Sequence, residues 1–234
     1  MKKAIAGLLL SMIAVLAGAC GGSAPSSTPQ ASHVTGAPAS SMGIYRAASL
    51  GYAVEYDTAH LSVNSDRSSP LQVFVKEQAL PMLVSKEGMQ AAQDSLVVFA
   101  ANGWSDSSGA SPPALAVVWR EPSNLTSATF KRLASTQGLR VAASAMEAAL
   151  KKSGASEVKV TPTHAPLHNR PALAVSMRAT STSTGNTSVS RWLFVYTPTS
   201  MYGFYGYCSA DAASTYLPLY EHMTHNFVVF PPYQ

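Results

Sequence analysis

The chain has 234 residues, of which only 12% are charged, and its 16 Lys and Arg against 12 Asp and Glu give a net charge of +4. Lys2 and Lys3 stand at the start, and the other 14 cations form no basic run that could follow a nucleic-acid backbone. The sequence also lacks Gly-rich phosphate loops, C-x-x-C metal pairs and a G-x-S-x-G serine motif. The composition is typical of an exported globular protein and gives no support to nucleic-acid binding.

The first 19 residues have the layout of an export signal. They read "MKKAIAGLLLSMIAVLAGA", with two lysines followed by an apolar run from Ala4 to Ala19. At about 16 residues, the run is shorter than the ~20 residues that a membrane-spanning helix needs. We therefore predict that residues 1–19 are a signal peptide, which is removed from the mature protein.

The signal ends in "LAGAC", which resembles the lipobox of bacterial lipoproteins, where small residues precede a lipidated cysteine. The resemblance implies that the thiol of Cys20 receives a diacylglycerol and that the new amino terminus is acylated, by chains such as palmitate. It further implies a lipid anchor at the cell envelope, on the extracytoplasmic side of a membrane. The alternative is an ordinary signal peptide cut nearby, which would leave Cys20 as a plain thiol.

Residues 20–44 are expected to form a flexible tether. The stretch from Gly21 to Gly43 is composed mainly of Gly, Ser, Pro, Ala and Thr and has no net charge. Such a segment buries too little apolar surface to offset the entropy cost of ordering it. The remaining residues, 45–234, contain no second linker and no internal repeat, so we predict one folded domain.

The first half of that domain is predicted to contain mostly strands. Tyr52, Val54 and Tyr56 alternate with Ala53 and Glu55, as in a strand that is buried on one side. Three further strands are predicted on alternation or β-branched content, over Leu71–Glu77, Ser95–Ala101 and Ala114–Glu121, the last two as a hairpin. Between the first two of these, "SKEGMQAAQD" is predicted as a short helix capped by Ser85.

The second half begins with a helix and continues as a sheet. Apolar residues recur at helical spacing from Leu139 to Lys152, and a Gly follows the terminal lysines. Four strands follow at regular spacing, "SEVKVTP", "PALAVSMRATS", "SVSRWLFVYTP" and "MYGFYGYCSA", which indicates an antiparallel sheet. A closing helix is expected with Pro218 in its first turn, followed by a short strand "FVVF". Its predicted apolar stripe consists of Tyr216, Leu219, Tyr220, Met223 and Phe227.

This order of elements resembles that of the PsbP-like domains. The resemblance lies in "GYAVEYDTAHLSV", the central helix followed by "EVKV", the turn "NRPA", the hairpin "SRWLFVYTPTSMYGFYGY" and the closing "YLPLYEHMTHNFVV". It implies an α/β (α+β) fold, with an antiparallel sheet covered by helices as an α/β/α sandwich. The resemblance implies binding or assembly roles and carries over no catalytic residue, metal ligand or cofactor.

Several histidines are candidate functional residues. His164, His168 and Arg170 stand in one loop that leads into a strand, a common place for function. His222 and His225 stand three apart on the closing helix, but opposite the apolar stripe, which favours a solvated helix face over a metal site. His60 follows Asp57 in "YDTAH", and this pair is expected to organise the turn.

The stretch "MYGFYGYC" offers a further candidate surface. Tyr202, Phe204 and Cys208 share one side of the predicted strand, and Tyr205 and Tyr207 share the other. One side must cover the core, and the other either packs under helices or forms a partner surface. No basic residue stands beside Cys208 to activate it, so we expect it to behave as a small apolar residue.

The sequence thus favours a non-enzymatic, membrane-anchored lipoprotein that binds a protein or another envelope component and needs no cofactor. Two alternatives remain open. One is an envelope hydrolase or transferase with a site near His164 and His168. The other is a carrier of an apolar ligand, which would require a large apolar cavity between the sheet and its helices.

Overall fold

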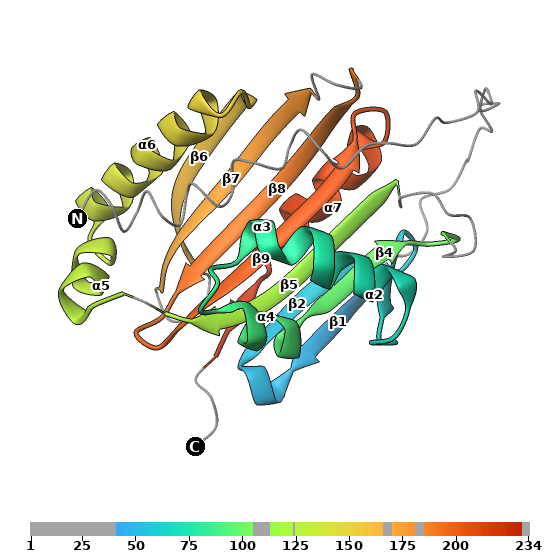
Figure 1. Ribbon diagram of the computed structural model, residues 1–234, viewed down its shortest axis with the longest axis horizontal. Helices are drawn as coiled ribbons and strands as arrows, with labels where there is room; N and C mark the ends of the chain where they lie inside the picture. Colours follow the sequence, from blue (N-terminus) through green and yellow to red (C-terminus); the bar gives the residue numbers. More distant parts are fainter. Residues whose placement is uncertain (1–40, 105–112, 124, 166–169, 181–184, 231–234) are drawn as a thin grey trace.

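The computed structural model in Figure 1 describes residues 41–104, 113–123, 125–165, 170–180 and 185–230. Its centre is a seven-stranded sheet with the strand order β3-β4-β5-β9-β8-β7-β6, in which every neighbouring pair is antiparallel. The strands are β3 (Leu61–Asn64), β4 (Val97–Ala101), β5 (Ala114–Pro122), β6 (Ser156–Ala165), β7 (Arg170–Thr180), β8 (Thr187–Tyr196) and β9 (Ser200–Ser209).

A second, three-stranded sheet joins the two ends of the described chain. It consists of β1 (Met42–Ala47), β2 (Tyr52–Asp57) and β10 (Val228–Val229), in the order β1-β2-β10. A short 3-10 helix, η1 (Ala48–Leu50), connects β1 to β2, and Gly51 closes it in the left-handed conformation, with φ of 80°. Both pairings in this sheet are antiparallel.

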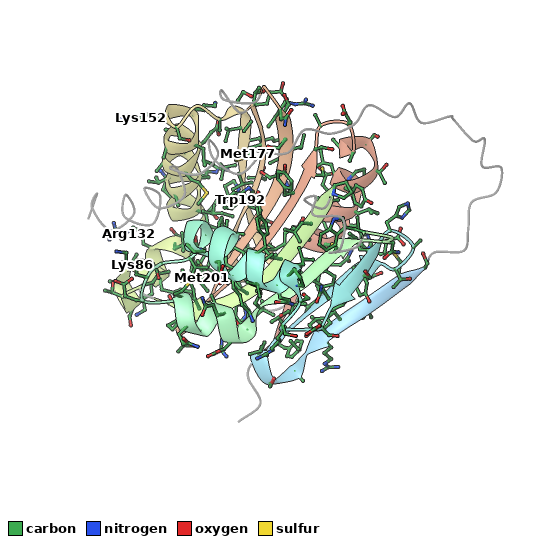
Figure 2. All side chains as sticks on the ribbon, turned by 45° about the vertical axis from the view of Figure 1, so that its right-hand side comes forward. Lys86, Arg132, Lys152, Met177, Trp192 and Met201 are labelled. Atoms are coloured by element: carbon green, nitrogen blue, oxygen red, sulfur yellow. The ribbon has the colours of Figure 1, made fainter. Side chains whose placement is uncertain are left out.

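One face of the large sheet, which we call the α6 face, is covered by helices from two parts of the chain. The first group is α2 (Pro70–Phe74), the π-helix η2 (Val75–Ala79), α3 (Leu80–Leu83) and α4 (Met89–Ser95). The second group is α5 (Ser127–Leu133) and α6 (Thr136–Lys152). Met177, Trp192 and Met201 belong to the apolar core on this face, which Figure 2 shows from the side of these helices.

The opposite face, which we call the α7 face, is covered by α7 (Ala213–His225) and the small sheet (Figure 1). Its core is aromatic, and the ring of Tyr52 stacks on Phe227 with 5.7 Å between centroids. Phe204 and Tyr220 meet edge to face at 6.2 Å. The predicted antiparallel sheet with helices on both faces is therefore confirmed, with the small sheet as an additional layer.

Most of the predicted elements are confirmed. The strands of the second half correspond to β6, β7, β8 and β9, and the hairpin of the first half corresponds to β4 and β5. The central helix is α6, and the closing strand is β10, which pairs with β2.

The strand predicted over Leu71–Glu77 is wrong, because this segment is helical in α2 and η2. Ser69 caps α2 by accepting a hydrogen bond from the Gln72 backbone N–H, and Pro70 occupies the first turn, where a missing N–H costs nothing. Leu71 and Val75 are buried four residues apart, so the segment buries a helical stripe.

Two details of the predicted helices also change. Ser85 does not cap α4 itself; its hydroxyl accepts from the Gly88 N–H in the turn before that helix. Pro218 lies inside α7, which begins five residues earlier at Ala213. The apolar stripe of α7 accordingly packs Leu217 against the core in place of Leu219.

Candidate functional site

Among the described residues, His164 and Arg170 of the predicted histidine loop do not form one site. His164 is exposed on β6 and pairs with Pro171, whereas Arg170 pairs with Ala165. Because neighbouring residues of a strand point to opposite faces, His164 and Arg170 lie on opposite sides of the sheet. His168 lies outside the described residues, as does Cys20.

The two histidines of α7 each lie close to polar groups of neighbouring residues. His222 Nε2 lies 3.5 Å from a carboxylate oxygen of Glu55 on β2, and the Asn226 amide lies 3.1 Å from the same nitrogen. His225 is exposed, with Nδ1 3.3 Å from the Glu221 carbonyl. Among the described residues, no three His, Cys, Asp or Glu side chains are placed to share a metal ion.

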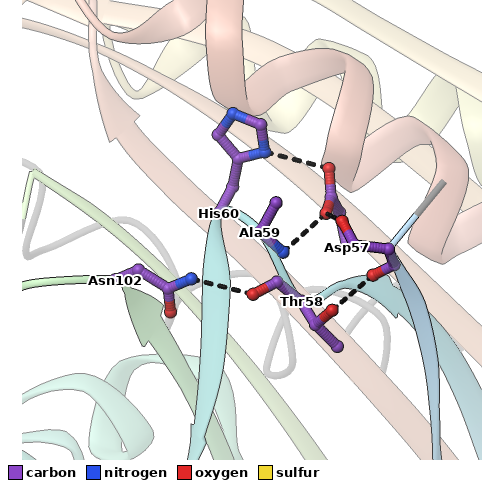
Figure 3. A network of polar contacts seen from close by, with 6 residues as sticks. Asp57, Thr58, Ala59, His60 and Asn102 are labelled. Carbon is purple, nitrogen blue, oxygen red and sulfur yellow. Dashed lines mark hydrogen bonds and ion pairs between the residues drawn. The ribbon is translucent and has the colours of Figure 1, made fainter. Parts of the chain in front are cut away.

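Asp57 and His60 form a polar cluster in the turn between β2 and β3 (Figure 3). Asp57 Oδ2 contacts His60 Nδ1 at 2.9 Å, and Oδ1 accepts from the Ala59 N–H and from Ser41 Oγ, both at 2.8 Å. Partial burial acts to raise the pKa of Asp57, but the hydrogen bonds from His60, Ala59 and Ser41 outweigh it and hold that pKa below its usual value. The predicted turn-organising role of this pair is confirmed.

The two sides of β9 differ as the alternation predicted. Phe204 and Cys208 are fully buried on the α7 face, whereas Tyr205 and Tyr207 are half-buried on the α6 face. The Tyr205 ring meets Trp192 edge to face, with 4.7 Å between centroids, and packs against the apolar core of the α6 face. Tyr205 therefore contributes to packing as well as to the surface.

Cys208 has the environment of a core residue. It has no exposed surface, and its thiol lies 3.9 Å from the Val189 carbonyl on β8. Burial raises the pKa of Cys208 to about 11, which leaves the thiol protonated at neutral pH. The geometry gives no nucleophile at this position.

An open hollow of about 180 Å³, which we call the arginine pocket, lies where the large sheet meets β10. It forms on the α7 face from adjacent strands, because Arg120 of β5 is directly opposite Tyr202 of β9. Tyr202 is in turn opposite Val195 of β8, and Val195 is opposite Ala172 of β7. Two residues beyond that last pair, on the same face, stand Thr197 and Arg170, and both line the pocket.

The charges in the arginine pocket are held in place by neighbouring groups. Arg120 donates from Nε to Ser200 Oγ at 3.0 Å, and its guanidinium lies over the Tyr202 ring, 5.8 Å from the centroid. The Arg170 Nε atom is buried and has no hydrogen-bond partner among the described residues. Burial raises the pKa of Tyr202, and the positive charges of Arg120 and Arg170 act against that rise.

Sequence reasoning singled out Arg170 but missed Arg120 and Tyr202. The signal for Arg120 was present, since it is the one cation in the otherwise apolar run "ALAVVWR" of a buried strand. Arg120 and Arg170 line the same pocket because β9 and β8 lie between β5 and β7. No local sequence pattern predicts that strand order.

A second open hollow of about 390 Å³ lies beside β1, β2 and β10, and Phe230 lines both hollows. Arg46 lies over the Phe230 ring, 5.0 Å from its centroid, on the side of this second hollow. Neither hollow lies between the large sheet and its helices, which is where a carrier of an apolar ligand would need its cavity.

Comparison with known proteins gives only low structural similarity. No family model and no curated protein matches it. Among solved structures, cyanobacterial PsbP (CyanoP) from Synechocystis sp. PCC 6803 is similar with a TM-score of 0.43 and 11% identity, over 85% of this chain and 98% of that one.

Two other solved structures are similar at the same low level. LpqN of Mycobacterium tuberculosis, described as involved in cell envelope biogenesis, has a TM-score of 0.36 and 13% identity over 58% of this chain and 72% of that one. A Bacteroides thetaiotaomicron VPI-5482 protein has a TM-score of 0.40 and 6% identity, over 80% and 48%. Likeness of this degree concerns fold and assigns no function.

Proposed function

We propose that this protein is a lipoprotein of the cell envelope that is anchored to a membrane through Cys20 and binds an envelope component with its folded part. The observation that carries the proposal is the sequence "LAGAC" at the end of an export signal, followed directly by a tether. The cysteine would leave the signal peptide as the first residue of the mature chain, carrying acyl chains on its sulfur and its amino group.

The physical chemistry of such an anchor is sufficient for stable attachment. Each buried methylene contributes ~0.8 kcal/mol, and two or more acyl chains hold a protein on a bilayer where one chain does so only reversibly. In the described residues, no helix is long and apolar enough to cross a membrane. Because β1 begins at Met42, the tether is shorter than the sequence predicted, and the 20 residues from Gly21 to Ser40 would give the folded part a reach of roughly 25 Å, taken as ~5–6 Å times the square root of the residue number.

A binding role is supported by the arginine pocket. It brings two cations to one open hollow, and one of them, Arg170, has a buried donor without a partner among the described residues. Groups of this kind are typical of sites that recognise an anion. No comparable observation favours the hydrolase alternative at His164, which is exposed and points away from Arg170.

The anchor is tested by substituting Cys20 with serine in the full chain. The wild-type protein should partition into the detergent phase and incorporate labelled palmitate, and Cys20→Ser should do neither. Cys208→Ser is the matched control, because it removes the other cysteine and leaves the anchor intact. The anchor proposal is wrong if Cys20→Ser still partitions into detergent and migrates like the wild type after signal cleavage.

The binding role is tested separately by a pull-down from envelope membranes with the anchored protein as bait. Specific retention of a protein or envelope component by the wild type supports the role. Recovery no higher than from beads without bait contradicts it, and this outcome is independent of the anchor.

A further inference from the structure

We propose that the arginine pocket binds an oxyanion, either a phosphate or a carboxylate, held between the side chains of Arg120 and Arg170. This inference deepens the binding role proposed above, on which it rests, and names the chemistry of its ligand. It does not require Cys20 to be lipidated.

The first support is an imbalance of charge. Both arginines line the same hollow, and none of the described residues that line it is Asp or Glu. The ion pairs formed within the described part of the chain involve Arg178, Lys151 and two histidines, but neither Arg120 nor Arg170. Two cations that line one hollow without a carboxylate make its potential positive, and an anion bound there would be attracted to both.

The second support is the set of hydrogen-bond donors. Arg120 donates a hydrogen bond from Nε to Ser200 Oγ, which holds the arginine side chain in place. No described residue accepts a hydrogen bond from Arg170 Nε, although the atom is buried and its desolvation therefore carries a cost. A guanidinium presents its N–H groups as a rigid fork that matches two oxygens of a carboxylate or phosphate. An oxyanion that came within hydrogen-bond distance of Arg170 Nε would satisfy the donor that the described residues leave unsatisfied.

The third support is the wall of the pocket. Tyr202, Val229 and Phe230 line it with largely apolar surface, and the Tyr202 hydroxyl is already engaged as a donor to the Leu50 carbonyl at 3.0 Å. Low-polarity walls strengthen the attraction between the arginines and an anion relative to the same pair in water. The wall thus favours a desolvated anion that is held by the arginines, because the hydroxyl proton of Tyr202 is already donated to Leu50.

The size of the pocket limits the ligand. At about 180 Å³, the hollow is smaller than the ~300–1,000 Å³ of sites that enclose drug-sized molecules. It fits a small oxyanion or the charged end of a longer molecule. The second hollow shares Phe230 with the arginine pocket and is lined by both Arg46 and Glu55.

The experiment is a titration of the purified full-length Cys20→Ser chain with inorganic phosphate and, separately, with acetate, at constant ionic strength with chloride as the reference anion. Binding is followed by calorimetry and by NMR of the arginine Nε–H signals. We expect saturable binding of at least one oxyanion, with the signals of Arg120 and Arg170 shifting most.

Single substitutions then assign the site. Arg120→Gln and Arg170→Gln should each weaken binding about tenfold or more, which is the scale expected for losing a charge-assisted hydrogen bond. Arg170→Lys keeps the charge but loses the fork and should weaken binding less than Arg170→Gln. Arg178→Gln is the matched control, since Arg178 lies on the same strand, is paired with Glu157 at 3.0 Å and should leave binding unchanged.

Vesicles distinguish the source of the oxyanion. Sedimentation of the Cys20→Ser chain with phosphatidylglycerol vesicles, lost in Arg120→Gln and Arg170→Gln, would support the proposal with a lipid headgroup as the ligand. Saturable binding of free phosphate or acetate without such sedimentation would support it with a soluble ligand.

The proposal is overturned if phosphate and acetate bind no more tightly than chloride and vesicles sediment the Cys20→Ser chain equally with and without the arginine substitutions. It is also overturned if binding occurs but the Nε–H signals of the two arginines do not move. This last readout uses the chain without arginine substitutions, so it holds even if a variant fails to fold. If no oxyanion binds but the lipidated wild type partitions into detergent, this inference is rejected and the anchor proposal is unaffected.

Discussion

The two faces of the large sheet are closed in different ways. On the α6 face, the two helices with the most strand contacts pack near their own place in the chain, α4 on β5 and α6 on β6 and β7. On the α7 face, α7 packs on β8 and β9, which directly precede it in the chain, and also on β2, near the other end of the described chain. The α6 face is therefore built from local units, whereas the α7 face closes only when both ends of the described chain meet.

This difference explains where the candidate site arises. The arginine pocket lies on the α7 face, at the point where β10 reaches the ends of β5, β7 and β9. A hollow formed by segments so distant in sequence exists only in the folded protein. A face built from local helix–strand units offers fewer such junctions between distant segments.

The largest expected effect comes from the two glycines of β9, which face opposite sides. A Cβ atom at Gly206 would lie 2.6 Å from the Tyr220 ring on the α7 face, and one at Gly203 would overlap the Trp119 ring on the α6 face. Both rings are fully buried, and the Tyr220 hydroxyl is bonded to the Tyr207 carbonyl at 2.8 Å, so neither ring can move aside cheaply. We expect Gly206→Ala and Gly203→Ala each to lower the free energy of unfolding by about 3 kcal/mol, measured by urea denaturation.

Gly103→Ala is the control for these substitutions. Gly103 has φ of 76° with no atom within 4 Å of a built Cβ, so its replacement costs only the strain of the left-handed conformation, about 1 kcal/mol. If Gly206→Ala costs no more than Gly103→Ala, the α7 face is less tightly closed than its aromatic packing indicates.

The second prediction concerns the buried carboxylate of the α6 face. Glu121 is 3% exposed, and burial raises its pKa above the usual value, despite hydrogen bonds from Ser85 and Trp119 that act in the opposite direction. The folded state therefore binds the proton more tightly than the unfolded state, and stability falls as pH rises from the unfolded pKa of about 4.5. Glu121→Gln removes this cost while keeping the shape.

We expect Glu121→Gln to raise the free energy of unfolding at pH 7.5 by on the order of 1 kcal/mol and to change it little at pH 4. Denaturation at the two pH values measures the difference. Glu147→Gln, which changes an exposed carboxylate paired with Lys151, should not reproduce the gain. A loss of stability in Glu121→Gln at pH 7.5, with little change at pH 4, would show that the charge itself is needed on this face.

The same local character decides what could be predicted from the sequence. Alternation over ten residues identified β8 and β9, and a helical stripe identified α6. Each of these patterns is long enough to fit only one period, that of a strand or that of a helix. Over Leu71–Glu77, seven residues satisfied a period of two, yet the Ser69–Pro70 start signal makes the segment helical. The helix-start signal of Ser69 and Pro70 is therefore more informative than an alternation of only seven residues.

The candidate site shows the same limit in another form. The Asp57–His60 cluster was predictable because its partners stand three residues apart. The arginine pocket was not, since Arg120 and Arg170 come together only through the order of the strands between them. The local sequence determines the turn, whereas the order and register of four strands determine the pocket.

A smaller effect is expected at Tyr52, on the α7 face. Its side chain has no exposed surface, and its hydroxyl has no hydrogen-bond partner among the residues that the structure describes. Tyr52→Phe keeps the ring stacked on Phe227 and removes the cost of the buried hydroxyl, so we expect a gain of about 1 kcal/mol in thermal or urea unfolding. Tyr220→Phe, on the same face, loses the bond to the Tyr207 carbonyl and should cost about 1 kcal/mol. Equal effects of the two substitutions would contradict this assignment of their hydroxyls.

The smallest expected effect is the reactivity of Cys208 in the native chain. Burial raises its pKa to about 11, so very little thiolate exists at pH 8, and the thiol has no exposed surface. In the Cys20→Ser chain, a thiol reagent at pH 8 should label Cys208 only as fast as the protein unfolds, and labelling should become complete in urea. Tyr207→Cys in a Cys20→Ser, Cys208→Ala background places a thiol one residue away on the half-buried α6 side of β9 and should label much faster. Rapid native labelling of Cys208 would mean that the α7 face opens without global unfolding, and the contrast between the two faces would then lie in their dynamics as well as in their packing.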